Sequence, residues 1–476
     1  MKIFYFNLLL ILICPTVNLI GQNFSYINTN FDSYYYSPQN LGFSTPQTAE
    51  FAKYGNTKID HYNGLLNLEI SIYEYKDNDF QIPISIKYNS EGFKPNKRPS
   101  IVGYNWILDA GGVITREVVG SPDDVKGNYT SSDGYKYMLD GLLVALRNNT
   151  YKYYTKPDLW NLALETTKNG NPYLKGDVKY DYAPDIFTFR FGKHSGKFII
   201  GNDGKAVSLS NDGYIIDITG LTIQQYSTTA TVTNSIIKIT APDGLVYTFG
   251  GSSNYLEYSI PNNPKGAMQK PVFINSWHIN SITAQTGKVA TFTYNSVEQK
   301  NKYKYYVQNQ VSSRTETRGD DGYYDGGIIK NTPYNGEIEF IDRVFTPMLN
   351  KITIDKTEII FNSSAKYSFY PNETINDVYA LSSIDIKYAT STIQRHTFSF
   401  INNGAFLFLD KLILNAQSND PQNYIFQYKS FSTTWPFSTT TSIDHWGFWK
   451  GGQNTTESTA SYLENIINNP LAELIH

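Results

Sequence analysis

The chain has 476 residues and a formal net charge of −3, and only 17% of its residues are charged, against roughly a quarter in typical soluble domains. With no basic run, this composition excludes the positive surfaces that bind nucleic acids or acidic membranes. Aromatic residues reach 15%, with 39 Tyr against 6 Trp, which suits β-strands that have one wettable face.

Residues 1–21 have the layout of a secretory signal peptide. Lys2 supplies a positive charge, and the apolar run Ile3–Ile13 is too short to span a bilayer as a helix. We expect cleavage after Gly21 and a secreted or cell-surface (outer membrane or extracellular) protein without a transmembrane anchor. Lipidation at Cys14 is the alternative, and the bulky Ile13 before it argues against this. Because Cys14 is the only cysteine, the cleaved chain would have no disulfide and no Cys-bound metal.

Residues 22–130 are expected to form an N-terminal β-hairpin module. Apolar residues alternate with polar ones from Leu66 to Ile72 and again from Phe80 to Tyr88, on either side of a polar turn at 76–79. This period of two predicts a hairpin with one buried face. Pro83 cannot donate a ladder hydrogen bond, so we expect its strand at a sheet edge or beside a bulge.

The same alternation continues through a β-rich middle at 131–294 and a C-terminal β-rich part at 331–450. Asp-Gly and Asn-Gly pairs such as Asp203-Gly204, Asp243-Gly244 and Asn403-Gly404 predict primed hairpin turns. The predicted fold class is all-β, a long antiparallel hairpin meander that forms extended, curved or partly closed sheets with very little helix. Residues 295–330 are predicted to be a flexible loop, and residues 451–476 a polar tail.

A distinctive motif runs from Gly103 to Arg116 (GYNWILDAGGVITR). Trp106 and Leu108 fall on one face of a predicted strand. Gly111 and Gly112 then permit a tight bend or a close backbone approach, and a second strand begins at Val113. These residues are the predicted structural motif of the chain.

This segment resembles the Leu-Gly-Trp-Ser-Leu…Gly…Ile-Thr-Arg signature of RHS/YD-repeat proteins, and it is similar to the SpvB-like region of Tc-toxin B components. Motifs at 184–189, 241–250 and 444–448 follow in matching order. The resemblance implies the N-terminal region of a long secreted RHS-type protein of the Bacteroidetes, with a shell-like β fold and a structural role in toxin or effector delivery. Asn105 and Ile107 replace the Gly and Ser of the pattern, which affects the bend.

The Tyr-Asp repeats and the RHS core of that family have no counterpart in this sequence. The chain is therefore expected to be either a truncated gene product or an N-terminal module that is used alone. A downstream chain that carries the RHS core is the expected partner.

The sequence offers little catalytic chemistry. No pair of its six His has metal-ligand spacing, and it has no Gly-x-Ser-x-Gly elbow. The acidic pairs Asp123-Asp124 and Asp320-Asp321 are expected to be solvated, although the second could hold calcium with loop oxygens. We expect no enzyme, no cofactor and no metal; a hydrolase would require turnover that depends on one carboxylate.

An alternative function of a different class is a surface adhesin or glycan-binding protein. His445, Trp446 and Trp449 form an aromatic cluster that could stack on sugar rings, although large aromatics more often pack inside. Binding on a glycan array that Trp446→Ala or Trp449→Ala abolishes would favour this function.

Overall fold

The computed structural model describes residues 58–60, 65–90, 92–127, 140–148, 167–168, 171–172, 181, 183–210, 213–229, 231–262, 271–314, 329–370, 373, 375–428, 436, 438 and 447–449. Apart from Lys58, these residues belong to one compact unit, Ile59–His476. Within it the fold is nearly all β, as predicted, and every strand pairing whose register is described is antiparallel. No helix in the described ranges is long and apolar enough to cross a membrane.

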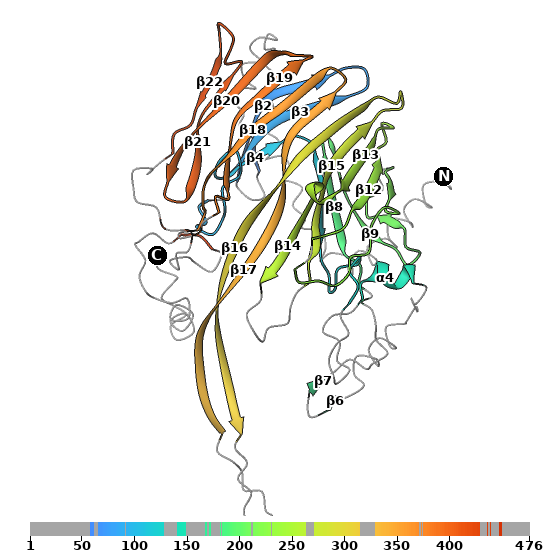
Figure 1. The fold of residues 1–476 in the computed structure, drawn as a ribbon, viewed down its shortest axis with the longest axis vertical. Helices are drawn as coiled ribbons and strands as arrows, with labels where there is room; N and C mark the ends of the chain where they lie inside the picture. Colours follow the sequence, from blue (N-terminus) through green and yellow to red (C-terminus); the bar gives the residue numbers. More distant parts are fainter. Residues whose placement is uncertain are drawn as a thin grey trace, which may run out of the picture. The chain divides into compact units, whose positions relative to one another are not determined.

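Two sheets contain almost all of the described strands (Figure 1). The first has the order β1-β2-β3-β4, with β1 Lys58–Asp60, β2 Leu65–Lys76, β3 Gln81–Asn89 and β4 Trp106–Asp109. The strands of the second sheet are β5 Gly112–Glu117, β8 Ile186–Phe191, β9 His194–Ile200, β10 Ala206–Ser208, β11 Ile215–Asp217, β12 Ser235–Thr240, β13 Val246–Gly251, β14 Leu256–Asn262, β15 Phe273–Thr283, β16 Val289–Arg314, β17 Ile329–Ile354, β18 Thr357–Tyr367, β19 Val378–Tyr388, β20 Ser391–Asn403, β21 Phe406–Leu414 and β22 Gln422–Ile425. A separate pair consists of β6 Thr167–Lys168 and β7 Asn171–Pro172.

The second sheet branches at β15. The first half of this strand pairs with β5 and β14, since Trp277 faces Ile114 on one side and Leu256 on the other. Its second half pairs with β13 and β16 instead. One long strand therefore connects four neighbours, and it brings β5 beside segments far along the chain.

The predicted hairpins are confirmed as β2–β3, β8–β9 and β12–β13. Pro83 pairs with Glu74 of β2, in a part of β3 that has no second neighbour, because β4 joins only from Ser85 onward. Its missing N–H therefore leaves no gap in a two-sided ladder.

Several turns differ from the predicted primed type. At 241–245 the Ala241 N–H bonds the Leu245 carbonyl and the Gly244 N–H bonds the Ala241 carbonyl. Only Gly244 has positive φ there, at +83°. Pro242 locks a negative φ at the first central position, so the turn follows the type I pattern with a left-handed glycine after it. The same two bonds recur at 201–205 and 284–288.

Residues 295–314 are strand and not the flexible loop that their polar composition predicted. β16 and β17 pair from Ala290 and Ile354 out to Arg314 and Ile329 (Figure 1). Backbone pairing does not require an apolar face, so the absence of apolar alternation in this segment did not exclude a strand. Residues 315–328, and the acidic pair at 320–321, lie outside the described residues.

One short helix, α4 (Leu142–Arg147), was not predicted. Asp140-Gly141 was expected to form a hairpin turn, but Gly141 instead occupies the N-cap of this helix. Four consecutive residues, Leu142 to Ala145, are buried. Six residues are too few for a helical period to stand out in the sequence.

The two sheets share one apolar core. Its buried members include Ile84 and Ile86 of the first sheet together with Phe187, Trp277 and Phe292 of the second. A smaller cluster gathers Tyr104, Phe369 and Phe406. The segment between β4 and β5 passes from one sheet to the other, and the candidate site is built around this crossover.

Candidate functional site at the sheet crossover

At the crossover between β4 and β5, and just before β4, three positions have a positive φ or no room for a side chain. Gly111 has φ +115°, and a Cβ on Gly112 would lie 2.5 Å from the Cβ of Phe191. Asn105, where the family pattern has Gly, has φ +62°, which Asn tolerates better than most residues. The predicted bend therefore exists, but it joins strands of two different sheets.

Trp106 anchors the β4 end of the crossover. Its side chain is buried in the main core, with ring centroids 5.1 Å from Tyr88 and 5.0 Å from Phe426. The Ser100 hydroxyl donates to the Trp106 carbonyl at 2.6 Å. Leu108 is half-buried on the same face, and Ile107 between them is 55% exposed. The predicted alternation of this strand is thus confirmed.

Arg116 ends the motif inside a cluster of charged side chains, here called the charged cluster: Arg116, Asp123, Asp124 and Asp185. The guanidinium has no exposed surface. Its Nη1 lies 2.5 Å from Asp124 Oδ1 and 3.6 Å from Asp185 Oδ2, and its Nη2 donates to the Ile274 carbonyl. The indole of Trp277 lies against the guanidinium at 5.1 Å.

Reciprocal hydrogen bonds between Asp123 and Asp185 also connect two loops. The Asp123 N–H donates to Asp185 Oδ2 at 2.9 Å, and the Asp185 N–H donates to Asp123 Oδ2 at 3.0 Å. Asp185 Oδ1 accepts the Val119 N–H as well. Desolvation, followed by the neighbouring Asp185, raises the pKa of Asp123, and desolvation also raises the pKa of Asp185.

The expectation that Asp123 and Asp124 are solvated is wrong. Both carboxyl groups are buried, because their loop is closed by α4: the Leu143 N–H bonds the Asp123 carbonyl. Within the described residues, no group of three His, Cys, Asp or Glu side chains is arranged to hold a metal ion. The charged cluster connects β5, α4 and the segment before β8, and it has no surface for a substrate.

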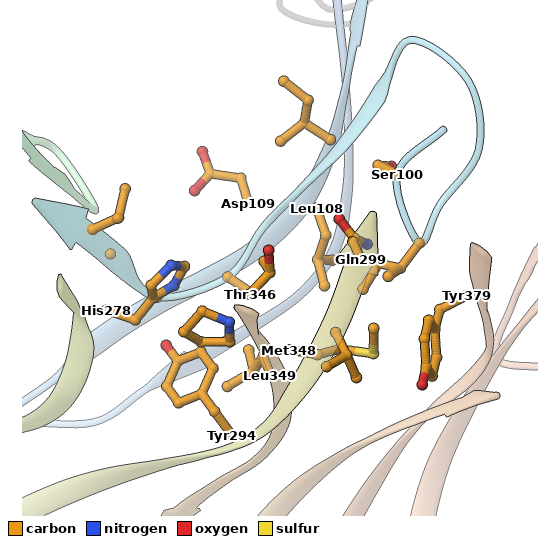
Figure 2. A pocket seen from close by; sticks show the side chains of 18 of the residues that line it. Ser100, Leu108, Asp109, His278, Tyr294, Gln299, Thr346, Met348, Leu349 and Tyr379 are labelled. Carbon is orange, nitrogen blue, oxygen red and sulfur yellow. The ribbon is translucent and has the colours of Figure 1, made fainter. Parts of the chain in front are cut away.

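A cavity of about 600 Å³ lies at the opposite end of β5. It is bounded by β4 and the crossover on one side, by the 98–101 segment, and by β15, β16, β17 and β19 (Figure 2). Ile107 and Arg190, both among its lining residues, are 55% and 64% exposed. The cavity is therefore lined in part by side chains that also lie at the surface.

The charged groups around the cavity are paired with one another. Lys87 Nζ lies 2.5 Å from Asp109 Oδ2, and Arg190 lies 3.7 Å from the same carboxylate. Arg98 is held 2.9 Å from Asp377 Oδ1 and donates to the Lys300 carbonyl at 2.6 Å. No uncompensated charge of the described residues faces the cavity.

His278 and Tyr294 project into the cavity from β15 and β16 (Figure 2). Their ring centroids are 5.5 Å apart at an edge-on angle of 67°. Desolvation lowers the pKa of His278 to about 4 and raises the pKa of Tyr294. Both side chains are therefore neutral near pH 7, and both can donate or accept hydrogen bonds.

Of the predicted glycan platform, His445 and Trp446 lie outside the described residues. Trp449 is half-buried, and its ring meets Phe93 edge-on at 6.0 Å. This contact is packing. His194 is buried between the Tyr214 hydroxyl and Asp243, at 3.0 Å from each.

Sequence reasoning identified the motif residues but not the cavity. Gln299, Met348 and Tyr379 are distant in sequence, and each occupies an ordinary strand position. Only the pairing of β15 through β19 brings them to the crossover. The sequence around His278 has no pattern that marks it as a cavity residue.

No protein-family model matches the chain, and no curated protein matches it. Among solved structures it is similar to the N-terminal domain of effector protein SpvB from Salmonella typhimurium strain LT2. That match has 9% identity and a TM-score of 0.30, and it covers 76% of this chain and 99% of that one. TcdB2-TccC3 matches with 9% identity and a TM-score of 0.31, over 74% of this chain and 15% of that one.

The Tc holotoxin pore of Photorhabdus luminescens matches at 10% identity and a TM-score of 0.31, over 74% of this chain and 15% of that one. These neighbours are toxin- and effector-related proteins. TM-scores near 0.3 carry no functional argument, so the function is argued from the chain's own residues.

Proposed function

We propose that this chain is a secreted, non-catalytic structural module of an RHS-type toxin or effector-delivery assembly. The observation that carries the proposal is the use of the motif residues. Trp106 fills the core, Gly112 lies against Phe191, and Arg116 is enclosed by carboxylates. The segment that resembles the RHS signature thus serves to join two sheets.

The expected partner is a chain that carries an RHS core. Among the described strands, β22 lies at one end of the order of the large sheet, and an edge strand can be extended by strands of another chain. Such docking would place this module at the start of a shell.

The test is reconstitution with the product of the neighbouring downstream gene, which the proposal predicts to carry an RHS core. The two purified chains are mixed, and their masses are measured by light scattering coupled to size exclusion. We expect a stable complex of fixed stoichiometry. Two chains that elute separately, together with hydrolysis of a polysaccharide by this chain alone, would overturn the proposal.

Secretion and the cleavage of the signal peptide are tested by a separate measurement. Mass spectrometry of the native protein from the culture supernatant should find Gln22 as the first residue. A cell-associated form with a lipid on Cys14 would instead show that the alternative anchor is used.

A further inference from the structure

We propose that the cavity at the crossover is a binding site for a neutral, mainly apolar molecule that carries a hydroxyl or ester oxygen, such as a neutral lipid-like amphiphile. This function goes beyond the structural role proposed above. It depends on three properties of the cavity: its walls, its charge balance and its unused polar groups.

The walls are largely aliphatic. Leu108 and Val113 contribute from the crossover, and Val297, Met348 and Leu349 contribute from β16 and β17 (Figure 2). A volume of about 600 Å³ is within the usual range of small-molecule sites. Water in such a space has few partners, so an apolar chain that displaces it gains free energy in proportion to the buried surface.

The charge balance favours a neutral ligand. Lys87 and Arg98 are committed to Asp109 and Asp377. An anion or a cation would have to give up its hydration against aliphatic walls without gaining a free counter-charge. A sugar is disfavoured for a related reason, since most of its hydroxyl groups would face Leu, Val and Met side chains.

The polar groups can orient one end of the ligand. In the described part of the chain the Tyr294 hydroxyl has no hydrogen-bond partner, and His278 has only a 3.3 Å contact from Nε2 to the Ser276 hydroxyl. Gln299 reaches the same cavity from β16 (Figure 2). A hydroxyl or ester oxygen placed beside Tyr294 and His278 would complete these hydrogen bonds.

Isothermal titration calorimetry with three probes of equal chain length tests the charge preference. The probes are monodecanoylglycerol, decanoate and decyltrimethylammonium, each below its micelle concentration. We expect one monodecanoylglycerol per chain and at least about tenfold weaker binding of both ions. Maltotriose is titrated in parallel as a sugar probe. Tighter binding of an ion or of maltotriose, or no binding of monodecanoylglycerol, would overturn the proposal.

Two variants locate the site. Met348→Trp fills the cavity and should abolish binding, whereas Ile393→Trp, at a position that is 56% exposed on β20, should not.

Tyr294→Phe removes one hydroxyl without changing the packing and should weaken binding about five- to tenfold. Its control is Tyr388→Phe, at an exposed position. If Met348→Trp does not fold, Tyr294→Phe alone decides, and unchanged affinity there would refute the site.

Discussion

The two ends of β5 lie in opposite surroundings, although the strand is only six residues long. At Gly112 it borders a neutral cavity with aliphatic walls, and at Arg116 it carries a fully buried guanidinium among three carboxyl groups. At the charged end, Arg116 pairs with Asp124 and Asp185. The backbone N–H groups of Asp123 and Asp185 bond each other's carboxyl groups. At the neutral end, the cations are paired with carboxylates at the rim of the cavity, so no unpaired charge faces its interior.

The largest expected effect concerns the charged end. Arg116→Met should lower the free energy of unfolding by roughly 3–5 kcal/mol, because it leaves buried carboxylates without their cation. Urea denaturation measures the loss. Arg190→Met, at a side chain that is 64% exposed, is the matched control and should change stability by less than about 0.5 kcal/mol. A loss below about 1 kcal/mol for Arg116→Met would show that the charged cluster is not an anchor.

The apolar side of the crossover should be nearly as sensitive. Trp106→Ala removes a core aromatic that contacts Tyr88 and Phe426, with an expected loss of about 3–5 kcal/mol. Trp106→Phe should cost less, because most of the ring contact survives. Unchanged melting and normal secretion of the Ala variant would contradict a core position.

The charged end should also give stability an unusual pH dependence. Burial and the neighbouring Asp185 raise the pKa of Asp123 above that of an unfolded Asp, so the folded chain retains a proton that the unfolded chain releases. The contribution of Asp123 to the free energy of unfolding is therefore present at low pH. It falls as pH rises toward the raised pKa, by up to about 1.4 kcal/mol per pH unit for one proton.

Asp123→Asn keeps the shape of this side chain and removes its titration. Urea midpoints at a series of pH values from about 5 to 8 should decline less steeply in this variant than in the natural chain. Equal slopes in the two chains would mean that Asp123 is ionised throughout this range.

The smallest effect is expected where a similar cation lies near solvent. Lys288 Nζ is 2.6 Å from Asp77 and 2.9 Å from Asp355, and all three side chains are at least 22% exposed. Solvent screening limits such a network, so Lys288→Met should cost less than about 1 kcal/mol in urea denaturation. A loss as large as that of Arg116→Met would remove the contrast between buried and exposed charge.

The sequence predicted most of the strands, because alternation from Ile70 to Ile72 and from Phe187 to Phe191 records which face is buried. The prediction failed where this alternation of apolar and polar residues is absent. The polar stretch after Asn295 gave no sign of its pairing with β17. The short helix after Gly141 had too few residues to show a period.

The candidate site was predictable only in part. Trp106 and Arg116 were identified because they belong to one continuous motif. The burial of Asp123 was not, since it depends on Asp185 and on a helix that closes over the loop. The cavity depends on the register of four strands, which local composition does not specify.

The branch at β15 has a consequence for the order in which the chain can fold. Ile114 finds its neighbour in Trp277, so β5 cannot complete its pairing until the polypeptide has been synthesised well past its midpoint. Contacts of such long range slow folding, because loop closure must precede the gain from pairing. Until β5 and β15 pair, the Ile-rich face of the early hairpin β2–β3 lacks its neighbours from the second sheet, so we expect a slow folding phase in which that face is exposed.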